Sequence, residues 1–540
     1  MRHAPSIQEA VGQKLLLAFG GQEAPPAELT DALHQLRPGG ITLYHSLNLD
    51  HPGQVRQLVV RLQQEARKAH LPPLLIAADQ EGGQLMAVGT GTTPLPGNMA
   101  LGAAGSPELA RQAGEVLGRE LAAMGINVNY APCCDVNVNP DNPVIGIRSF
   151  GEDPLKVAEL SAAVVAGIQS AGVAATAKHF PGHGDTDTDS HYGLPVVPHS
   201  LQRLRRVELP PFAAAIRAGV KLVMSGHLAL PAVDGNTGLP ATLSPAVLKG
   251  LLRTDMRFHG VIVTDAMEMQ AIRQGDGLGE DAVRAAAAGA DLLLLNSNPI
   301  DQRRVFASLL QAVQGGRLEE NDLLDSAGRV LELKEWLATQ GPPPDLSVVG
   351  CSAHQAVAAE IAVRSITLVR DQAGWLPLRL RDGQRLAVVF PRPMNLTPAD
   401  TSATVVPALS PALRMFCPNV DELMVAHSPD EQEIADVLRR LRGYAVVVLG
   451  TLNAFSQTGQ AALVRAVLAA RNGAPTIVAA LRMPYDLAAF PEAPAFVCSF
   501  GILEPSMQAL AQALAGQTAF QGRLPVSIPG LYPAGHGHKL

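Results

Sequence analysis

The sequence predicts an α/β protein with a large first domain built around a parallel sheet and a second, smaller α/β domain. Short β-rich apolar runs alternate with longer segments of helical periodicity from residue 40 to about residue 335. A proline-rich break follows, and the same alternation then resumes. Strands that alternate with helices pair in parallel, either in a closed eight-stranded barrel or in an open doubly wound sheet.

Seven strands are expected in the first domain, each a short apolar run bounded by turn-forming or polar residues. They lie at Gly40–Tyr44, Leu74–Asp79, Ile126–Ala131, Val173–His179, Lys221–Ser225, Val261–Asp265 and Ala290–Asn296. A closed barrel needs eight strands, so the eighth is irregular or carries no clear signal. Ala-rich segments with apolar residues at i, i+3 and i+4 predict the helices Glu108–Met124, Leu155–Ala171, Leu201–Ala218, Pro245–Thr254 and Glu280–Ala288.

The break lies at residues 339–350, TQGPPPDLSVVG. Three consecutive prolines cannot occupy a helix interior and favour an extended spacer. We therefore predict a first domain at 1–338, a linker at 339–350 and a second domain at 351–540. Strands of the second domain are expected at Ile366–Val369, Leu386–Phe390, Glu422–Ala426, Ala445–Gly450, Thr476–Leu481 and Phe496–Phe500.

Composition excludes several classes of function. The 540 residues include 42 basic and 49 acidic side chains, a formal charge of −7, and 47% are apolar. This balance gives no reason to expect nucleic acid or an anionic membrane as a partner. Five cysteines without CxxC spacing predict neither a disulfide framework nor a cysteine zinc site. Without a signal-peptide pattern or a long uncharged apolar stretch, a cytoplasmic protein is expected.

Ionisable residues gather at the downstream ends of four predicted strands. Asp79, the pair Lys178 and His179, His227, and Asp265 each stand at or just after a strand end. One such aspartate is commonly only a helix cap. Four strands that bring ionisable groups to one rim instead indicate a functional site, since the carboxyl ends of barrel strands carry the active site.

The segment Lys178–Tyr192, KHFPGHGDTDTDSHY, holds three acids and three histidines within fifteen residues. Calcium binding in an EF-hand loop fails, because Ser190 and Val196 stand where glycine and glutamate are needed. Zinc on the three histidines is disfavoured, because no HExxH is present and the surrounding glycines indicate a mobile loop. In an extended loop, Asp189 and His191 project to the same side, so the carboxylate can orient the imidazole as a proton donor near neutral pH.

Asp265 is the complementary candidate, a carboxylate at the end of a buried strand. Its alternative role is to cap the helical segment that follows. A carboxylate that attacks an anomeric carbon, opposite a group that protonates the departing oxygen, is the arrangement of retaining glycoside hydrolysis. The proton donor is usually a carboxylic acid, and this sequence offers His191 instead.

Three motifs resemble those of the bacterial β-N-acetylglucosaminidases (β-hexosaminidases) of glycoside hydrolase family 3. They are KHFPGHG at 178–184 with Asp189-Ser190-His191, DQEGG at 79–83, and NPVIGIRSFG at 142–151. The resemblance extends from about Leu15 to Trp336, and the tail at 522–530 resembles the end of the sandwich domain that many members carry. It implies a TIM-like (β/α)8 barrel followed by a smaller α/β domain, an αβα sandwich.

The resemblance also implies site residues. Asp265 is expected to be the nucleophile and Asp189 with His191 the acid/base pair. The expected sugar-binding residues are Asp79, Arg148, Lys178, His179 and His227. No metal and no organic cofactor are expected. Family members specialised for cell-wall fragments often carry arginines just after the DQEGG turn, whereas Gln84 and Ala87 stand here, which leaves muropeptides and chitooligosaccharides both open as substrates.

The function expected is therefore that of a retaining exo-β-N-acetylhexosaminidase that removes terminal β-linked N-acetylglucosamine, in peptidoglycan recycling or on chitooligosaccharides, with a homodimer as an open question. One alternative is a phosphorylase, because a neutral histidine does not repel phosphate as a carboxylate would. A β-glucosidase and a sugar-binding protein without turnover are the others. The β-glucosidase-like members take their acid/base carboxylate from the second domain and lack the Asp-Ser-His loop, which is present here.

Overall fold

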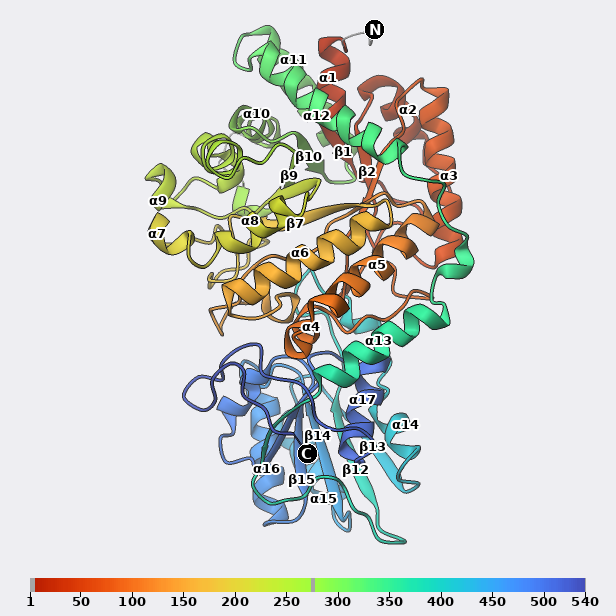
Figure 1. Ribbon diagram of the computed structural model, residues 1–540, viewed down its shortest axis with the longest axis vertical. Coiled ribbons are helices and arrows are strands. Elements are labelled where there is room, and N and C mark those ends of the chain that lie inside the picture. The colour runs from red at the N-terminus through yellow and green to blue at the C-terminus, as the bar shows by residue number, and fades with distance from the viewer. Residues whose placement is uncertain (1–4, 273–276, 540) are drawn as a thin grey trace.

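Eight parallel strands close into a barrel in the computed structural model, which describes residues 5–272 and 277–539 (Figure 1). In the order in which they neighbour one another they are β1 (Leu15–Leu17), β10 (Leu292–Leu295), β9 (Val261–Ala266), β8 (Leu222–Ser225), β7 (Ala174–Phe180), β6 (Val128–Asn129), β3 (Leu75–Ala78) and β2 (Gly40–Thr42). The predicted TIM-like barrel is thereby confirmed, and the open sheet is excluded.

The strand that the sequence did not reveal is β1. It has three residues, Leu15–Leu17, all buried. Its register closes the barrel, since Leu16 pairs with Gly40 of β2 and with Leu294 of β10. Three consecutive leucines show no alternation, and they directly follow helix α1 (Ile7–Gln13), so they lack the pattern that marks a strand. The seven predicted strands all exist and are mostly shorter than predicted.

Helices cover the outside of the barrel (Figure 1). The longer ones are α2 (Ala27–Leu36), α3 (Pro52–Lys68), α5 (Pro107–Met124), α6 (Pro154–Ser170), α8 (Leu209–Arg217), α10 (Leu278–Ala288), α11 (Pro299–Gln314) and α12 (Glu320–Ala338); the short ones are α4 (Asn98–Ala104), α7 (Leu201–Leu204) and α9 (Pro231–Asp234). The single helix predicted at Leu201–Ala218 is two helices, α7 and α8. Pro210 and Pro211 lie in the first turn of α8, where a proline's missing N–H costs least. The helix predicted at Pro245–Thr254 is a π-helix, η3 (Ala246–Asp255).

The second domain is built on a mixed six-stranded sheet. Its order is β11 (Thr367–Asp371), β16 (Ala495–Cys498), β15 (Thr476–Ala480), β14 (Val446–Thr451), β12 (Leu386–Pro391) and β13 (Val420–Val425). Only the β11–β16 pair is antiparallel. The helices are α13 (Ser352–Ser365), α14 (Leu409–Arg414), α15 (Glu431–Arg440), α16 (Thr458–Arg471) and α17 (Glu504–Leu514).

Both faces of this sheet are covered, as in an αβα sandwich. Leu386 and Val388 of β12 belong to the same apolar cluster as residues of α14 and α17. Ala387 and Val389 belong to the cluster that contains residues of α15 and α16. Since successive side chains of a strand point to opposite faces, one short strand contributes to two cores.

The segment between α12 and α13 runs along the outside of the barrel (Figure 1). The amide of Gly350 donates to Glu120 of α5 at 2.9 Å, and His354 Nδ1 lies 2.9 Å from the same carboxylate oxygen. Residues 346–365, with a mean hydropathy of 1.4, are long and apolar enough to cross a membrane, a test that core helices of soluble proteins also pass. Here the segment is held to the barrel by a carboxylate that is itself 4% exposed. The boundaries at 338 and 350 stay predictions.

The second domain is fixed to the barrel by polar contacts as well as by α13. Glu152 of the barrel accepts from the amide and the hydroxyl of Ser527, at 2.8 and 2.6 Å. Asn137 Nδ2 donates to the hydroxyl of Tyr485 at 3.0 Å. Several such bonds spread over the interface fix the orientation of one domain on the other, so loops of both can build one site.

Candidate active site

A cavity of about 570 Å³ lies at the carboxyl ends of the barrel strands, and both domains line it. Six of the eight predicted site residues lie on its wall: Asp79, Arg148, Lys178, His179, His191 and Asp265. Its size and position are those of a small-ligand site in a barrel protein. A second cavity of about 580 Å³ lies at the opposite end, against residues 340–344, and contains none of the predicted residues.

A buried ion-pair network supports one side of the cavity. Lys178 Nζ lies 2.6 Å from Asp79 Oδ1 and 2.6 Å from Glu81 Oε1. Arg148 binds both oxygens of Glu81, through Nε at 3.0 Å and Nη2 at 2.8 Å. The side chain of Glu81 is 2% exposed and that of Asp79 is 26% exposed. Asp79 therefore faces the cavity, and Glu81 stands behind it as the shared partner of both cations.

Three elements bring these charges together. Asp79 and Glu81 lie at the end of β3 and in β4 (Gln80–Gly82), and Lys178 lies in β7. Arg148 ends the 3-10 helix η1 (Gly146–Arg148). Burial alone would raise the pKa of Glu81, but the charges of Arg148 and Lys178 and their hydrogen bonds lower it to about 2. Glu81 is consequently ionised at every pH at which a protein of this kind works.

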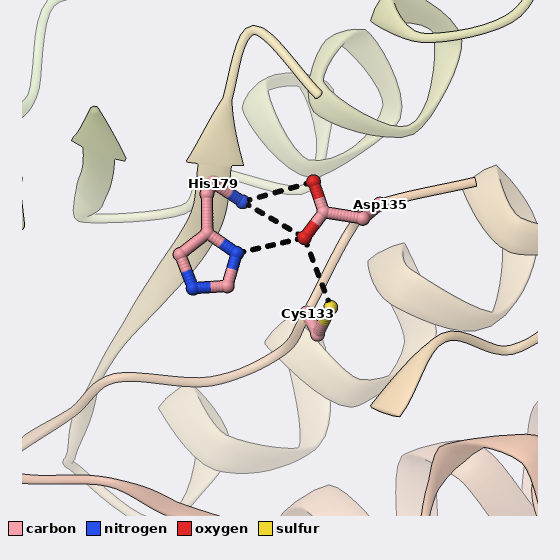
Figure 2. A group of neighbouring side chains, drawn as sticks. All are labelled: Cys133, Asp135 and His179. Atoms are coloured by element: carbon pink, nitrogen blue, oxygen red, sulfur yellow. Dashed lines mark hydrogen bonds and ion pairs between the residues drawn. The ribbon is translucent and has the colours of Figure 1, made fainter. Parts of the chain in front are cut away.

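Asp135 holds His179 in place (Figure 2). Its Oδ2 lies 2.7 Å from His179 Nδ1 and accepts from the Cys133 thiol at 3.1 Å. Its Oδ1 accepts from the amide of His183 at 2.6 Å, and both oxygens accept from the amide of His179 at 3.3 Å. Burial would raise the pKa of Asp135, but the charge and hydrogen bonds of His179 and His183 lower it. The other ring nitrogen of His179, Nε2, lies 3.4 Å from Arg148 Nη2, and both residues line the cavity.

Asp265 lies in β9, and its carboxylate reaches the cavity. Its Oδ1 accepts from the amide of Ala266 at 2.8 Å. Burial would raise the pKa of Asp265, but the charges of His179, His227 and His191 lower it to about 2. A carboxylate that is ionised and partly exposed to the cavity is in the state that nucleophilic attack requires.

His227 differs from its prediction as a sugar-binding residue. It is completely buried and is not among the residues that line the cavity. Its Nδ1 lies 2.8 Å from the hydroxyl of Thr242, and its Nε2 lies 3.0 Å from the carbonyl of Ala266, the residue after Asp265. Both ring nitrogens are thus used within the protein, and the ring holds the end of β9 rather than facing the cavity.

The predicted contact between Asp189 and His191 exists. Asp189 Oδ1 lies 2.6 Å from His191 Nδ1 and accepts from the amide of the same residue at 2.9 Å. Burial lowers the pKa of His191, but the hydrogen bond that its ring donates to Asp189 and the charges of Asp265 and Asp189 outweigh burial and raise the pKa above 6.5. His191 and Asp265 both line the same cavity.

His183 fastens the loop that carries this pair. Its Nδ1 lies 2.7 Å from Thr186 Oγ1, and its Nε2 lies 3.1 Å from Ser190 Oγ, between the two members of the pair. Burial lowers the pKa of His183 to about 4, so the ring is neutral at neutral pH. A neutral imidazole accepts at one nitrogen and donates at the other, which fits two hydroxyl neighbours.

Residues 6–333 match the family model described as the glycosyl hydrolase family 3 N terminal domain. The chain belongs to glycosyl hydrolase family 3. It is 30% identical to "Beta-hexosaminidase A" of Pseudoalteromonas piscicida over 593 aligned positions that cover 97% of each chain. It is 34% identical to "Beta-hexosaminidase" of Nitrosomonas eutropha over 56% of this chain and 87% of that one.

A solved structure of a family 3 β-N-acetylglucosaminidase from Paenibacillus sp. str. FPU-7 has the same fold. The sequences are 40% identical, the TM-score is 0.90, and the match covers 97% of this chain and 99% of that one. As a member of this family the chain is a glycoside hydrolase.

Sequence reasoning missed two residues that shape this family 3 site, Glu81 and Asp135. Glu81 stands inside the DQEGG turn, which holds two acids, and the sequence gives no sign of which of the two is buried. Asp135 comes four residues after the predicted strand Ile126–Ala131. Polar residues at the downstream ends of barrel strands are often functional. Applied to the whole loop after the strand, this rule would have identified Asp135.

Cys133, Asp135 and His179 form the one group of potential metal ligands among the described residues (Figure 2). Their geometry does not fit a metal ion. Two ligands of a tetrahedral zinc ion stand about 3.3 Å apart, whereas His179 Nδ1 and Asp135 Oδ2 are 2.7 Å apart. That separation is a hydrogen bond, and the carboxylate already accepts from two amides.

We expect hydrolysis of an aryl glycoside to be insensitive to chelation, because the acids and histidines of the site bind one another. Dialysis against EDTA should leave kcat/KM unchanged, and added Zn²⁺ should not raise it. The measurement is kcat/KM before and after dialysis, with metal content checked by atomic spectroscopy. Loss of activity on chelation, restored by one added metal, would contradict this interpretation of the group.

Proposed function

We propose that this protein is a retaining exo-β-N-acetylglucosaminidase that releases terminal β-linked N-acetylglucosamine. The observation that carries the proposal is the Asp189–His191 pair, which shares a cavity with the ionised carboxylate of Asp265. The names of the relatives support the sugar, since those reported above are called β-hexosaminidases or a β-N-acetylglucosaminidase.

The reaction takes two steps. In the first, a carboxylate oxygen of Asp265 attacks the anomeric carbon, the glycosidic bond breaks, and the departing oxygen takes the proton from Nε2 of His191. In the second, the now neutral His191 removes a proton from water, whose oxygen attacks the same carbon and frees Asp265. Two inversions leave the sugar in its original β configuration. Asp189 keeps Nδ1 protonated and stabilises the imidazolium.

The terminal sugar is bound by residues on the side of the ion-pair network. Asp79 is partly open to the cavity and still has an oxygen to accept from hydroxyls, since one oxygen is taken by Lys178. Arg148, Lys178 and His179 offer donors to the remaining oxygens of the ring. We assign His227 to positioning the end of β9 behind Asp265. A cytoplasmic location, a homodimer and a role in peptidoglycan recycling stay predictions.

Two substitutions separate the roles of nucleophile and acid. Asp265→Ala should abolish turnover of every substrate. His191→Ala should lower kcat/KM for chitobiose by about 10²- to 10⁴-fold, the usual contribution of a general acid. It should spare dinitrophenyl β-N-acetylglucosaminide, because that leaving group needs little protonation.

His199→Ala is the matched control. His199 Nε2 lies 2.6 Å from Asp185 Oδ2 in a similar pair, and neither residue lines the cavity. It should leave both substrates unaffected. Equal losses for good and poor leaving groups in His191→Ala would remove the proton donor from the proposal.

The pH dependence follows from the raised pKa of His191. The acid must start protonated, so kcat/KM for chitobiose should hold at acid pH and fall as pH rises through a value above 6.5. Asp189→Asn removes the negative charge that raises this pKa, so the alkaline limb should move to lower pH. Rate profiles of both proteins measure the shift. An alkaline limb at the same pH in Asp189→Asn would contradict the pairing.

A phosphorylase is the second candidate, because the proton donor is an imidazole and not a carboxylate. Phosphate would then replace water in the second step. We expect chitobiose in phosphate buffer to yield N-acetylglucosamine alone, because Asp265 is ionised and the two cations on the described part of the cavity wall, Arg148 and Lys178, are already paired with carboxylates. Phosphorus NMR of the products measures this, and N-acetylglucosamine 1-phosphate would establish the alternative.

A further inference from the structure

A segment of the second domain forms part of the cavity wall. Residues 395–401 follow β12 and reach the carboxyl end of the barrel, where five of them line the cavity: Asn395, Pro398, Ala399, Asp400 and Thr401. The sugar-binding network and Asp265 belong to the barrel, so this segment supplies a different part of the wall. None of the residues to which we assign catalysis lies in it.

Gln84 of the barrel holds this segment through both polar atoms of its side-chain amide and through its backbone carbonyl. Its Nε2 donates to the carbonyl of Ala399 at 3.1 Å, and its Oε1 accepts from Arg482. Its backbone carbonyl accepts from the amide of Thr401 at 2.8 Å and from the hydroxyl of that residue at 3.0 Å. Gln84 is thus a connection between the turn that carries Asp79 and the second domain.

A buried ion pair completes the attachment. Arg482 Nη1 lies 2.9 Å from Asp400 Oδ2, and the two side chains are 6% and 0% exposed. Asp400 also accepts from the amides of Leu396 at 3.1 Å and Ser402 at 2.8 Å. A buried pair with these extra bonds is held in one geometry, because separating the two charges would leave each unpaired in a dry interior. The segment therefore has a fixed position above the cavity.

Carboxylates outnumber lysine and arginine side chains among the described residues that line the cavity. They are Asp79, Asp265, Glu268 and Asp400, of which Asp79 is paired with Lys178 and Asp400 with Arg482. Arg148 and Lys178 are the only lysine or arginine among the described residues that line it, and both are paired with Glu81 or Asp79. Recognition of a carboxylate on the leaving group would need a free cation, of which arginine is the usual form.

Tyr192 offers the surface that an uncharged sugar needs. It follows His191 directly, lines the cavity and is 66% exposed. An exposed aromatic ring beside the proton donor can stack on the apolar face of a pyranose. Asn395, on the segment of the second domain, supplies a neutral amide for hydroxyls.

We propose that residues 395–401, held by Gln84 and Arg482, form the subsite for the leaving group together with Tyr192. The subsite takes an uncharged sugar, as in a chitooligosaccharide, and disfavours the anionic muramyl unit of a cell-wall fragment. This inference rests on the proposed function and names its substrate class. Gln84 and Arg482 are positioning residues that act through the segment.

The first experiment loosens the segment without touching the sugar-binding network. Gln84→Met keeps the side-chain length and removes its hydrogen bonds to Ala399 and Arg482. We expect kcat/KM for chitobiose to fall about tenfold, the effect of about one lost hydrogen bond, mainly through KM. The ratio of kcat/KM for chitobiose to that for a dinitrophenyl glycoside should fall with it. Val406→Ala, an 80% exposed position a few residues further on, is the control and should change neither value.

The second experiment changes the charge of the subsite at an exposed position, so it remains decisive should Gln84→Met fail to fold. Asn395→Lys adds a free cation to the wall, and Asn395→Gln is its neutral control. The substrates are chitobiose and the disaccharide of N-acetylglucosamine with anhydro-N-acetylmuramic acid. The wild type should prefer chitobiose, and Asn395→Lys should shift the ratio toward the anionic disaccharide by about two- to fivefold, an effect that salt removes.

The inference would be overturned by a wild type that prefers the anionic disaccharide. It would also be overturned if each variant changed kcat/KM by the same factor for the two substrates compared. A wild type that releases no sugar from any N-acetylglucosaminide, including the dinitrophenyl glycoside, would instead refute the proposed function.

Discussion

The site depends on one buried carboxylate, Glu81, and the two cations that neutralise it. A buried ion is tolerated only when it is paired and its remaining hydrogen bonds are satisfied. Glu81 receives two bonds from Arg148 and one contact from Lys178. Three segments far apart in the sequence must therefore meet at this point, and Lys178 can reach Asp79 only because they do. The side chains of Asp79, Arg148 and Lys178, which line the cavity, are therefore positioned by the charge of Glu81, which is not among the residues that line it.

Much of this arrangement could be predicted from the sequence, because its signals are local. Alternation of apolar runs and helices marks seven barrel strands, and polar residues at their ends mark the rim. The Asp189–His191 contact spans two residues, so extended geometry alone brings the carboxylate to the imidazole. The six strands of the second domain are each found where apolar runs predict them. In each case the signal lies within a few residues of sequence. It is either a contact between near neighbours or the repeat of apolar residues in a strand or helix.

What could not be predicted depends on contacts between distant segments. Asp135 and His179 are 44 residues apart, and Gln84 meets Arg482 across 398. His227 shows the same limit: its place after β8 indicates a rim residue, yet Thr242 and Ala266 bind both of its ring nitrogens and draw it inside. Strand β1 was missed for another reason. Its short leucine run directly follows a helix, and only pairing with β2 and β10 fixes it as a strand.

The charge of the cavity affects two properties together. One is the pH range in which His191, the proposed proton donor, is protonated, and the other is the charge of the substrate that the cavity accepts. His191 owes its raised pKa to the negative charges of Asp189 and Asp265, and Arg148 acts in the opposite direction. A cation added to the wall to hold an anionic leaving group would, by the same Coulomb interaction, lower the pKa of His191 and reduce the fraction protonated near neutral pH. The carboxylates of Asp189 and Asp265 therefore favour the imidazolium, and the same negative charges disfavour an anionic leaving group. A family 3 enzyme that uses histidine as its acid can accept anions only if its cations are kept far from the imidazole or are neutralised by the substrate itself.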